Sequence, residues 1–178
     1  AVAQGYVYDK ATGVRTYRPE NVNGNYNIGG NVNYSMPLDK ARRLTLNSAL
    51  WSRLYNSVDL IGVTDGMAPR RSTVQTYNSG GSLNMEYAFP KDVKVGVKAR
   101  CTWNYLTGSR EDFTPLNTYD YNYGLIAQAE LPWNLQFNTD LTLYSRRGYG
   151  ESSMNTDDIV WNATLSKKLF KNRVTLSL

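Results

Sequence analysis

Three cationic side chains stand at even-numbered positions within residues 93–105, namely Lys94, Lys98 and Arg100. Residues two apart in a β-strand point to the same face, so a strand here would carry the three charges side by side. Cations that line a water-filled lumen favour anions. The alternative is that each cation pairs with an Asp or Glu of a neighbouring strand or of a plug.

Five arginines stand in segments whose composition predicts long loops. A guanidinium group binds phosphate or carboxylate through two parallel hydrogen bonds, so these arginines could contact lipopolysaccharide phosphates or an anionic ligand. A role in solubility alone is equally compatible with the sequence. The five are Arg70, Arg71, Arg110, Arg146 and Arg147.

The sequence contains no recognisable catalytic or metal-binding constellation. It has no histidine, which removes the commonest general base and metal ligand. Its acidic pairs, Glu111-Asp112 and Asp157-Asp158, lie in or beside predicted loops, where nothing holds two carboxylates about 5–10 Å apart as glycoside hydrolysis requires. Cys101 is the single cysteine, so it cannot form an internal disulfide and is expected as a small residue on an outward face. We therefore expect no enzyme, no cofactor and no metal.

The stretch that carries the three cations has two unlike faces. Its odd positions read Val, Val, Val, Ala, Cys, Trp and Tyr, and its even positions are polar. This period of two predicts a β-strand. A strand of a soluble domain is usually about 5–6 residues long, whereas a tilted strand that crosses a bilayer needs about 9–11. The length therefore favours a strand in a membrane.

The same period recurs along the chain and predicts about nine strands or part-strands, at residues 1–8, 21–36, 42–58, 74–89, 93–105, 118–131, 134–144, 158–169 and 173–178. Short turns at Pro37, Pro90, Pro132 and Lys171 alternate with long loops at 59–73, 107–117 and 145–157. Residues 9–20 also have loop composition, in which Val14 and Tyr17 could form a short ribbon. Trp51 and Tyr55 have the wrong parity for the apolar face, and the sequence leaves open whether they face lipid or lumen.

The composition supports a one-sided apolar sheet. Mean hydropathy is −0.51, although the chain contains 14 tyrosines. No apolar run approaches the ~18 residues of a membrane helix. The net charge is +5, but the cations do not cluster on a helix, so nucleic acid is not expected as a partner.

Short turns on one side, longer loops on the other and aromatic residues near the strand ends are typical of outer-membrane barrels. We therefore predict an all-β fold, an antiparallel up-and-down transmembrane β-barrel. The alternative for the apolar stripe is the core of a soluble β-sandwich.

Four segments carry a resemblance to a known family: YDKATGVRTYRPENVNGNYN (8–27), MPLDKARRLTL (36–46), NSVDLIG (56–62) and SKKLFKNRVTLSL (166–178). They resemble the C-terminal β-barrel portion of TonB-dependent receptor-like outer-membrane proteins of the Bacteroides-group type. The resemblance covers nearly the whole chain and is specific for the barrel but not for the cargo.

The resemblance implies that residues 1–178 are a segment of a larger barrel of about 22 strands whose plug lies outside this chain. It implies a part in a receptor of the bacterial outer membrane that takes up a nutrient. The implied partners are membrane lipid, a TonB-type energy-coupling protein reached through missing N-terminal parts, and a surface lipoprotein. Two other functions stay open: a small self-contained barrel with a structural or adhesive role, and a soluble β-sandwich or lipocalin-like binding protein.

Overall fold

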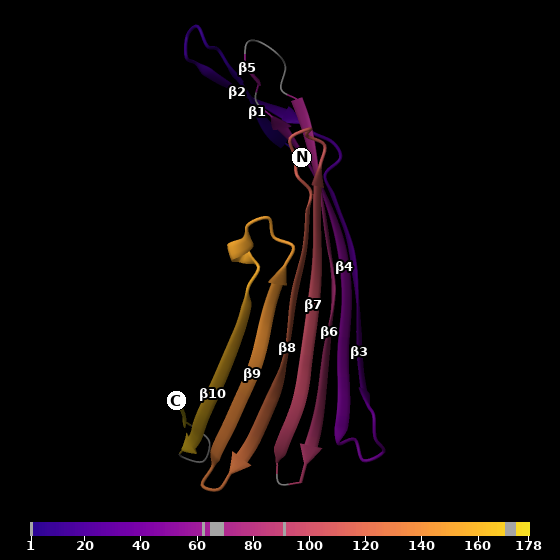
Figure 1. Ribbon diagram of the computed structural model, residues 1–178, viewed down its shortest axis with the longest axis vertical. Helices are drawn as coiled ribbons and strands as arrows, with labels where there is room; N and C mark the ends of the chain where they lie inside the picture. Colours follow the sequence, from indigo (N-terminus) through magenta and orange to yellow (C-terminus); the bar gives the residue numbers. More distant parts are fainter. Residues whose placement is uncertain (1, 62, 65–69, 91, 170–173) are drawn as a thin grey trace. The chain divides into compact units, whose positions relative to one another are not determined.

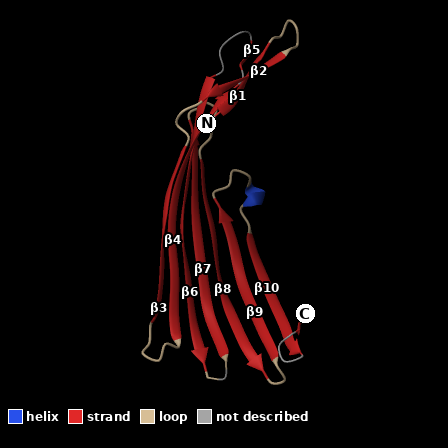
Figure 2. Cartoon of the chain, turned by 180° about the vertical axis from the view of Figure 1, so that it is seen from behind, coloured by secondary structure: helices blue, strands red, loops and turns tan. Residues whose placement is uncertain are grey.

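The computed structural model describes residues 2–61, 63–64, 70–90, 92–169 and 174–178. In this part every element is a β-strand except one short 3-10 helix, η1, in the connection between β9 and β10 (Figure 2). The all-β prediction is therefore confirmed. The elements are β1 (Val2–Tyr8), β2 (Arg15–Asn21), β3 (Tyr26–Pro37), β4 (Leu44–Ile61), β5 (Val63–Thr64), β6 (Arg70–Phe89), β7 (Val93–Gly108), β8 (Leu116–Leu131), β9 (Leu135–Arg147), η1 (Ser152–Met154), β10 (Asp157–Leu169) and β11 (Val174–Ser177).

Strands that follow one another in sequence lie beside one another in the larger sheet, whose order is β11-β10-β9-β8-β7-β6-β4-β3 (Figure 1). This is the predicted up-and-down arrangement, and β8, β9, β10 and β11 pair antiparallel. A smaller sheet has the order β2-β1-β5, in which β1 pairs parallel with β5 over two residues. Among the described residues β3 and β11 are the edges of the larger sheet and do not pair with each other, so the sheet is not closed.

The strands are longer than predicted at several ends. For residues 9–20 the composition predicts a loop with a short ribbon at Val14 and Tyr17; in the structure Tyr17 lies in β2 (Arg15–Asn21), which pairs with β1 from Val2↔Asn21 to Tyr8↔Arg15, and Val14 lies just before that strand. The predicted loop 59–73 is also too long, because β4 continues to Ile61 and β6 begins at Arg70; residues 62 and 65–69 lie outside the described part. Backbone pairing extends these strands through polar residues, and side-chain composition does not reveal that pairing.

Contacts divide the chain into two compact units. The first unit comprises residues 1–30, 52–78 and 104–117. Its buried apolar cluster consists of Ala3, Val22, Val58 and Leu60. Beside this cluster the amide Nδ2 of Asn56 donates to the carbonyl oxygen of Gly24 at 2.6 Å. Among its described residues the first unit thus has a small local buried core.

The second unit comprises residues 31–51, 79–103 and 118–178, and one face of its strands is apolar. The register places Leu125 opposite Leu141, and Leu141 opposite Trp161, so three neighbouring strands present apolar side chains together. These side chains are exposed, up to 71% for Trp161. The exposed apolar residues of this unit include Val32, Tyr34, Leu50, Leu83, Val95, Val97, Tyr123, Leu125, Leu141, Ile159, Trp161 and Leu165.

The opposite face is polar and crowded. At Gly96 a Cβ would lie 2.7 Å from the Met85 carbonyl oxygen, and at Gly124 it would lie 2.9 Å from the Cα of Thr142. Both obstacles belong to the backbone of the neighbouring strand. Glycine inside a strand permits such close approach and marks points where a sheet bends. Neighbouring strands thus approach closely at two places on the polar face.

Among the described residues, no helix has the length and apolar character to cross a membrane.

The crowding at Gly124 predicts a substitution effect that depends on position. Gly124→Ala should lower the free energy of unfolding by about 1–3 kcal/mol, because the new methyl group meets backbone that cannot move aside. Gly30→Ala is the matched control in another strand, since nothing lies within 4 Å of its Cβ position. It should leave stability unchanged or raise it by up to ~1 kcal/mol. Urea unfolding in detergent micelles measures both, and equal effects would contradict the close approach at Gly124.

Candidate functional site

The polar face of the second unit is the candidate site, and Lys98 lies within its hydrogen-bond network. The Lys98 Nζ is 3.1 Å from Oδ2 of Asp140, which belongs to β9, two strands away. Thr142 Oγ1 donates to the same oxygen at 3.0 Å, and Asn162 Nδ2 donates to Oδ1 at 3.3 Å. Lys98 thus pairs with a carboxylate of the same chain, which belongs to the second strand along the sheet and not to a neighbouring strand.

Lys98 can reach across β8 to Asp140 because the residue between them is a glycine. A Cβ at Gly96 would lie 3.0 Å from Cγ1 of Ile126, so these two residues are neighbours on the polar face. Antiparallel pairing then places Lys98 beside Gly124, which has no side chain to block the route to Asp140. The same glycine that lets the strands approach also leaves room for this ion pair.

Arg100 stacks on an aromatic ring. Its guanidinium carbon is 4.4 Å from the ring centre of Trp51, and a Cβ at Gly80 would lie 2.5 Å from Cζ2 of the same indole. Trp51 therefore lies on the polar face with Arg100. In the first unit, Tyr55 lies on one face with Arg53, whose Nη1 donates to the Tyr55 hydroxyl at 3.5 Å.

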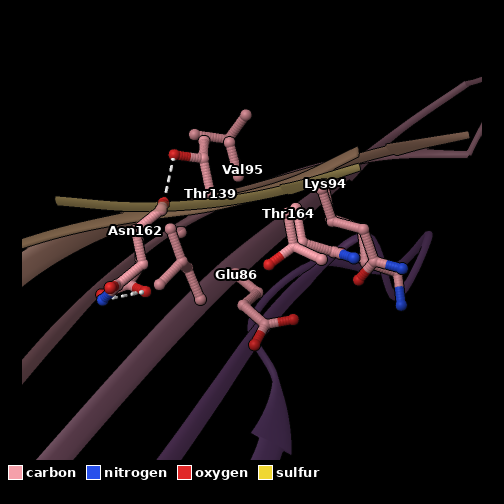
Figure 3. Close-up of a pocket in the computed structure, with 12 residues that line it drawn as sticks. Glu86, Lys94, Val95, Thr139, Asn162 and Thr164 are labelled. Carbon is pink, nitrogen blue, oxygen red and sulfur yellow. Dashed lines mark hydrogen bonds between the residues drawn. The ribbon is translucent and has the colours of Figure 1, made fainter. Parts of the chain in front are cut away.

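Lys94 lines a polar hollow of about 240 Å³. Figure 3 shows that Glu86 and Asn162 lie on one side of the strands, whereas Val95 and Thr139 lie on the other. The hollow therefore opens on the polar face and contains amide, carboxylate, hydroxyl and amine groups. Its lining side chains on this face are Glu86, Lys94, Ile126, Gln128, Asn138, Asp140, Asn162 and Thr164.

Only one of the five arginines predicted in loops lies in a loop. Arg110 stands in the connection between β7 and β8 and pairs with Asp112, whose pKa is lowered mainly by the hydrogen bond from that guanidinium. Arg70 and Arg71 instead begin β6, and Arg71 Nη2 donates to the Asn23 carbonyl oxygen at 3.3 Å. The loop prediction was wrong for these two residues because β6 starts earlier than its composition indicated.

The loop prediction was also wrong for Arg146 and Arg147, which end β9. Arg146 Nε lies 3.7 Å from Oδ1 of Asp120, and Arg147 Nη2 lies 2.6 Å from Oδ2 of Asp157. Both guanidinium groups thus face carboxylates of the same chain. The acidic pair Asp157-Asp158 likewise belongs to β10 and not to a loop.

Tyr149 is a site residue that the sequence analysis missed. Its hydroxyl donates to Asp120, at 2.9 Å from Oδ1 and 3.0 Å from Oδ2. Asn155 accepts from the Tyr149 backbone N–H at 3.1 Å and donates to its carbonyl oxygen at 2.9 Å. Burial, followed by the hydrogen bond to Asp120, raises the pKa of the Tyr149 hydroxyl. The connection after β9 is thereby fastened to β8, and no spacing in the sequence signals this contact.

No family model, curated protein or solved structure matches this chain. Within the described ranges no three Asp, Glu or Cys side chains are grouped so that they could hold a metal ion.

The Tyr149 contact predicts a local effect of removing one hydroxyl. Tyr149→Phe should release the connection between β9 and β10, because a hydrogen bond to a charged carboxylate contributes about 1–3 kcal/mol. Amide hydrogen exchange at residues 148–156 should accelerate while β8 and β9 stay protected. Tyr144→Phe is the control, since its exposed hydroxyl has no hydrogen-bond partner in the described part. Equal exchange in the two variants would contradict the fastening role.

The pH dependence of this contact has a definite sign. The hydroxyl must keep its proton to donate, and its folded pKa is raised above the ordinary tyrosine value of about 10. Its contribution to stability is therefore complete below about pH 10 and is lost as the pH rises through the folded value.

Proposed function

We propose that the chain forms part of the wall of a β-barrel in the bacterial outer membrane, with its apolar face toward lipid and its polar face toward a water-filled lumen. The observation that carries the proposal is the division of one sheet into an exposed apolar face and a polar face on which neighbouring strands approach closely at Gly96 and Gly124. The wall of a membrane barrel has an apolar outer face in contact with lipid and a polar inner face in contact with water. The two faces of this sheet match that division.

The exposed apolar face argues against a soluble monomer. Leu50 is 64% exposed and Ile159 is 72% exposed. Around Val95, Leu125, Leu141 and Trp161 the same face forms one apolar hollow of about 390 Å³. A soluble monomer rarely exposes such a contiguous apolar patch, whereas lipid chains would cover it.

Strand length supports a membrane location. β6 has 20 residues, and β7 and β8 have 16 each. A tilted strand needs only about 9–11 residues to cross the bilayer, so these strands can cross and continue beyond it. A β-sandwich, the soluble alternative, uses strands of about 5–6 residues.

The small self-contained barrel is less well supported than a segment of a larger one. The larger sheet has open edges at β3 and β11 among the described residues. An unpaired edge in lipid is costly, since no water satisfies its backbone groups. Pairing of these edges with further strands would remove that cost.

We further propose that this wall belongs to a TonB-dependent receptor that takes up a nutrient. The support is the resemblance of the four sequence segments and the polar, ion-paired inner face. Its partners would then be outer-membrane lipid, a TonB-type energy-coupling protein and a surface lipoprotein. Cross-linking in cells that detects no TonB-type protein beside this one would contradict the transport part and leave the barrel wall standing.

Two neighbouring residues on opposite faces of β7 test the membrane assignment. Val97→Lys should hinder assembly into lipid vesicles by about 2–4 kcal/mol, because position 97 would face the middle of the bilayer. Lys98→Ala should cost less than about 1 kcal/mol, since its pair with Asp140 is partly exposed. Folding into vesicles, followed by heat-modifiable gel mobility, measures both. Equal tolerance of the two substitutions would overturn the assignment of faces.

A further inference from the structure

The three cations of β7 differ in whether a carboxylate of the same chain lies beside them. Lys98 is neutralised by Asp140. Lys94 shares its hollow with the carboxylate of Glu86. Arg100 is exposed, and within the described part of the chain no carboxylate pairs with it. Of the three, Arg100 therefore keeps the most unused capacity to bind an anion.

Three strands hold the Arg100 guanidinium in place. Its carbon lies 4.4 Å from the ring centre of Trp51 on β4, and the indole lies against Gly80 on β6. Any side chain at position 80 would collide with the indole, so the glycine makes room for the aromatic platform. Stacking engages the flat face of a guanidinium and leaves the N–H groups at its edge free. Because the stack already holds the guanidinium in one orientation, Arg100 loses less conformational entropy when it binds an anion.

The neighbours of Arg100 can add hydrogen bonds. Residues 81–83, 99–101 and 121–123 lie around one hollow, which places the three strands side by side at this level. Odd-numbered residues of these strands face the apolar side, so Ser82 and Asn122 share the polar side with Arg100. Arg100 extends across β6 toward Trp51, so the hydroxyl of Ser82 on β6 lies on the same side of β7 as the guanidinium and can donate to an oxyanion, whereas Asn122 on β8 lies on the other side of β7.

We propose that Arg100, stacked on Trp51 and with Ser82 on the neighbouring strand β6, is a binding site for an oxyanion, either a carboxylate or a phosphate group of a ligand. The planar guanidinium edge matches both groups through paired hydrogen bonds. The site rests on the proposed function in one respect, because it requires the polar face to be wet. The competing occupant is an acidic side chain from another part of the protein.

Calorimetric titration of the full protein, folded in detergent micelles, tests the site with inorganic phosphate in one arm and citrate in the other. Arg100→Gln should weaken the binding of at least one anion about 10-fold or more, as expected for a charge-assisted hydrogen-bonded pair. Trp51→Leu should weaken it about 3-fold or more, because the guanidinium loses its platform. Arg53→Gln is the matched control and should leave binding unchanged, since Arg53 contacts a tyrosine hydroxyl and, within the described residues, stacks on no aromatic ring.

Two results would overturn the site: no binding of either anion to the native protein, or an equal loss in Arg53→Gln. If the native protein binds neither anion and Arg100→Gln also lowers the unfolding midpoint, Arg100 pairs with an internal acid. Heat-modifiable gel mobility identifies variants that fail to fold, and Arg100→Lys then supplies a charged replacement without the planar edge. A native protein that inserts into vesicles but binds no anion would refute this site alone, whereas failure to insert would refute the proposed function.

Discussion

Side chains alternate between the two faces of every strand, and this alternation constrains most of what the second unit can do. Leu125, Leu141 and Trp161 follow one another across three paired strands, while Asp140 and Asn162 occupy the opposite side of the same strands. Moving a strand by one residue would put every one of these side chains on the wrong face. The strand register is therefore fixed by both faces of the sheet, because one face requires apolar side chains and the other requires amides and charges.

The glycines connect this division to the geometry of the polar face. Gly96 and Gly124 lie where the neighbouring backbone leaves no space for a Cβ, and Gly80 lies beneath the indole of Trp51. Removing side chains from the inner side of a bend permits strands to approach and leaves room for long side chains to cross from strand to strand. The Lys98–Asp140 pair and the Arg100–Trp51 stack both use such room. The close approach of the strands and the organisation of the candidate site thus have one structural cause.

The sequence predicted the strands and faces well where the alternation is regular, as in residues 93–105 and 158–169. It failed at strand ends: Arg146 and Arg147 belong to β9 because backbone pairing continues through residues that are usually found in loops. It also failed where a contact joins residues that are distant in sequence. Tyr149 reaches Asp120 across 29 positions, and the side of Trp51 depends on Gly80 and Arg100 in two other strands. Periodicity describes one strand at a time, so it cannot report contacts between strands.

The most direct measurement of the central claim uses the single cysteine. Cys101 is exposed and lines an apolar hollow with Leu50, Leu83 and Tyr123, whereas its neighbour Thr102 has the opposite parity. In lipid vesicles, Cys101 should resist a water-soluble thiol reagent and react readily once the protein is unfolded in urea, because lipid would cover this face. Thr102→Cys in a Cys101→Ala background should react in the folded protein, because position 102 would face water. Rapid labelling of Cys101 in vesicles, or a native protein that stays monomeric in water without detergent, would contradict the account.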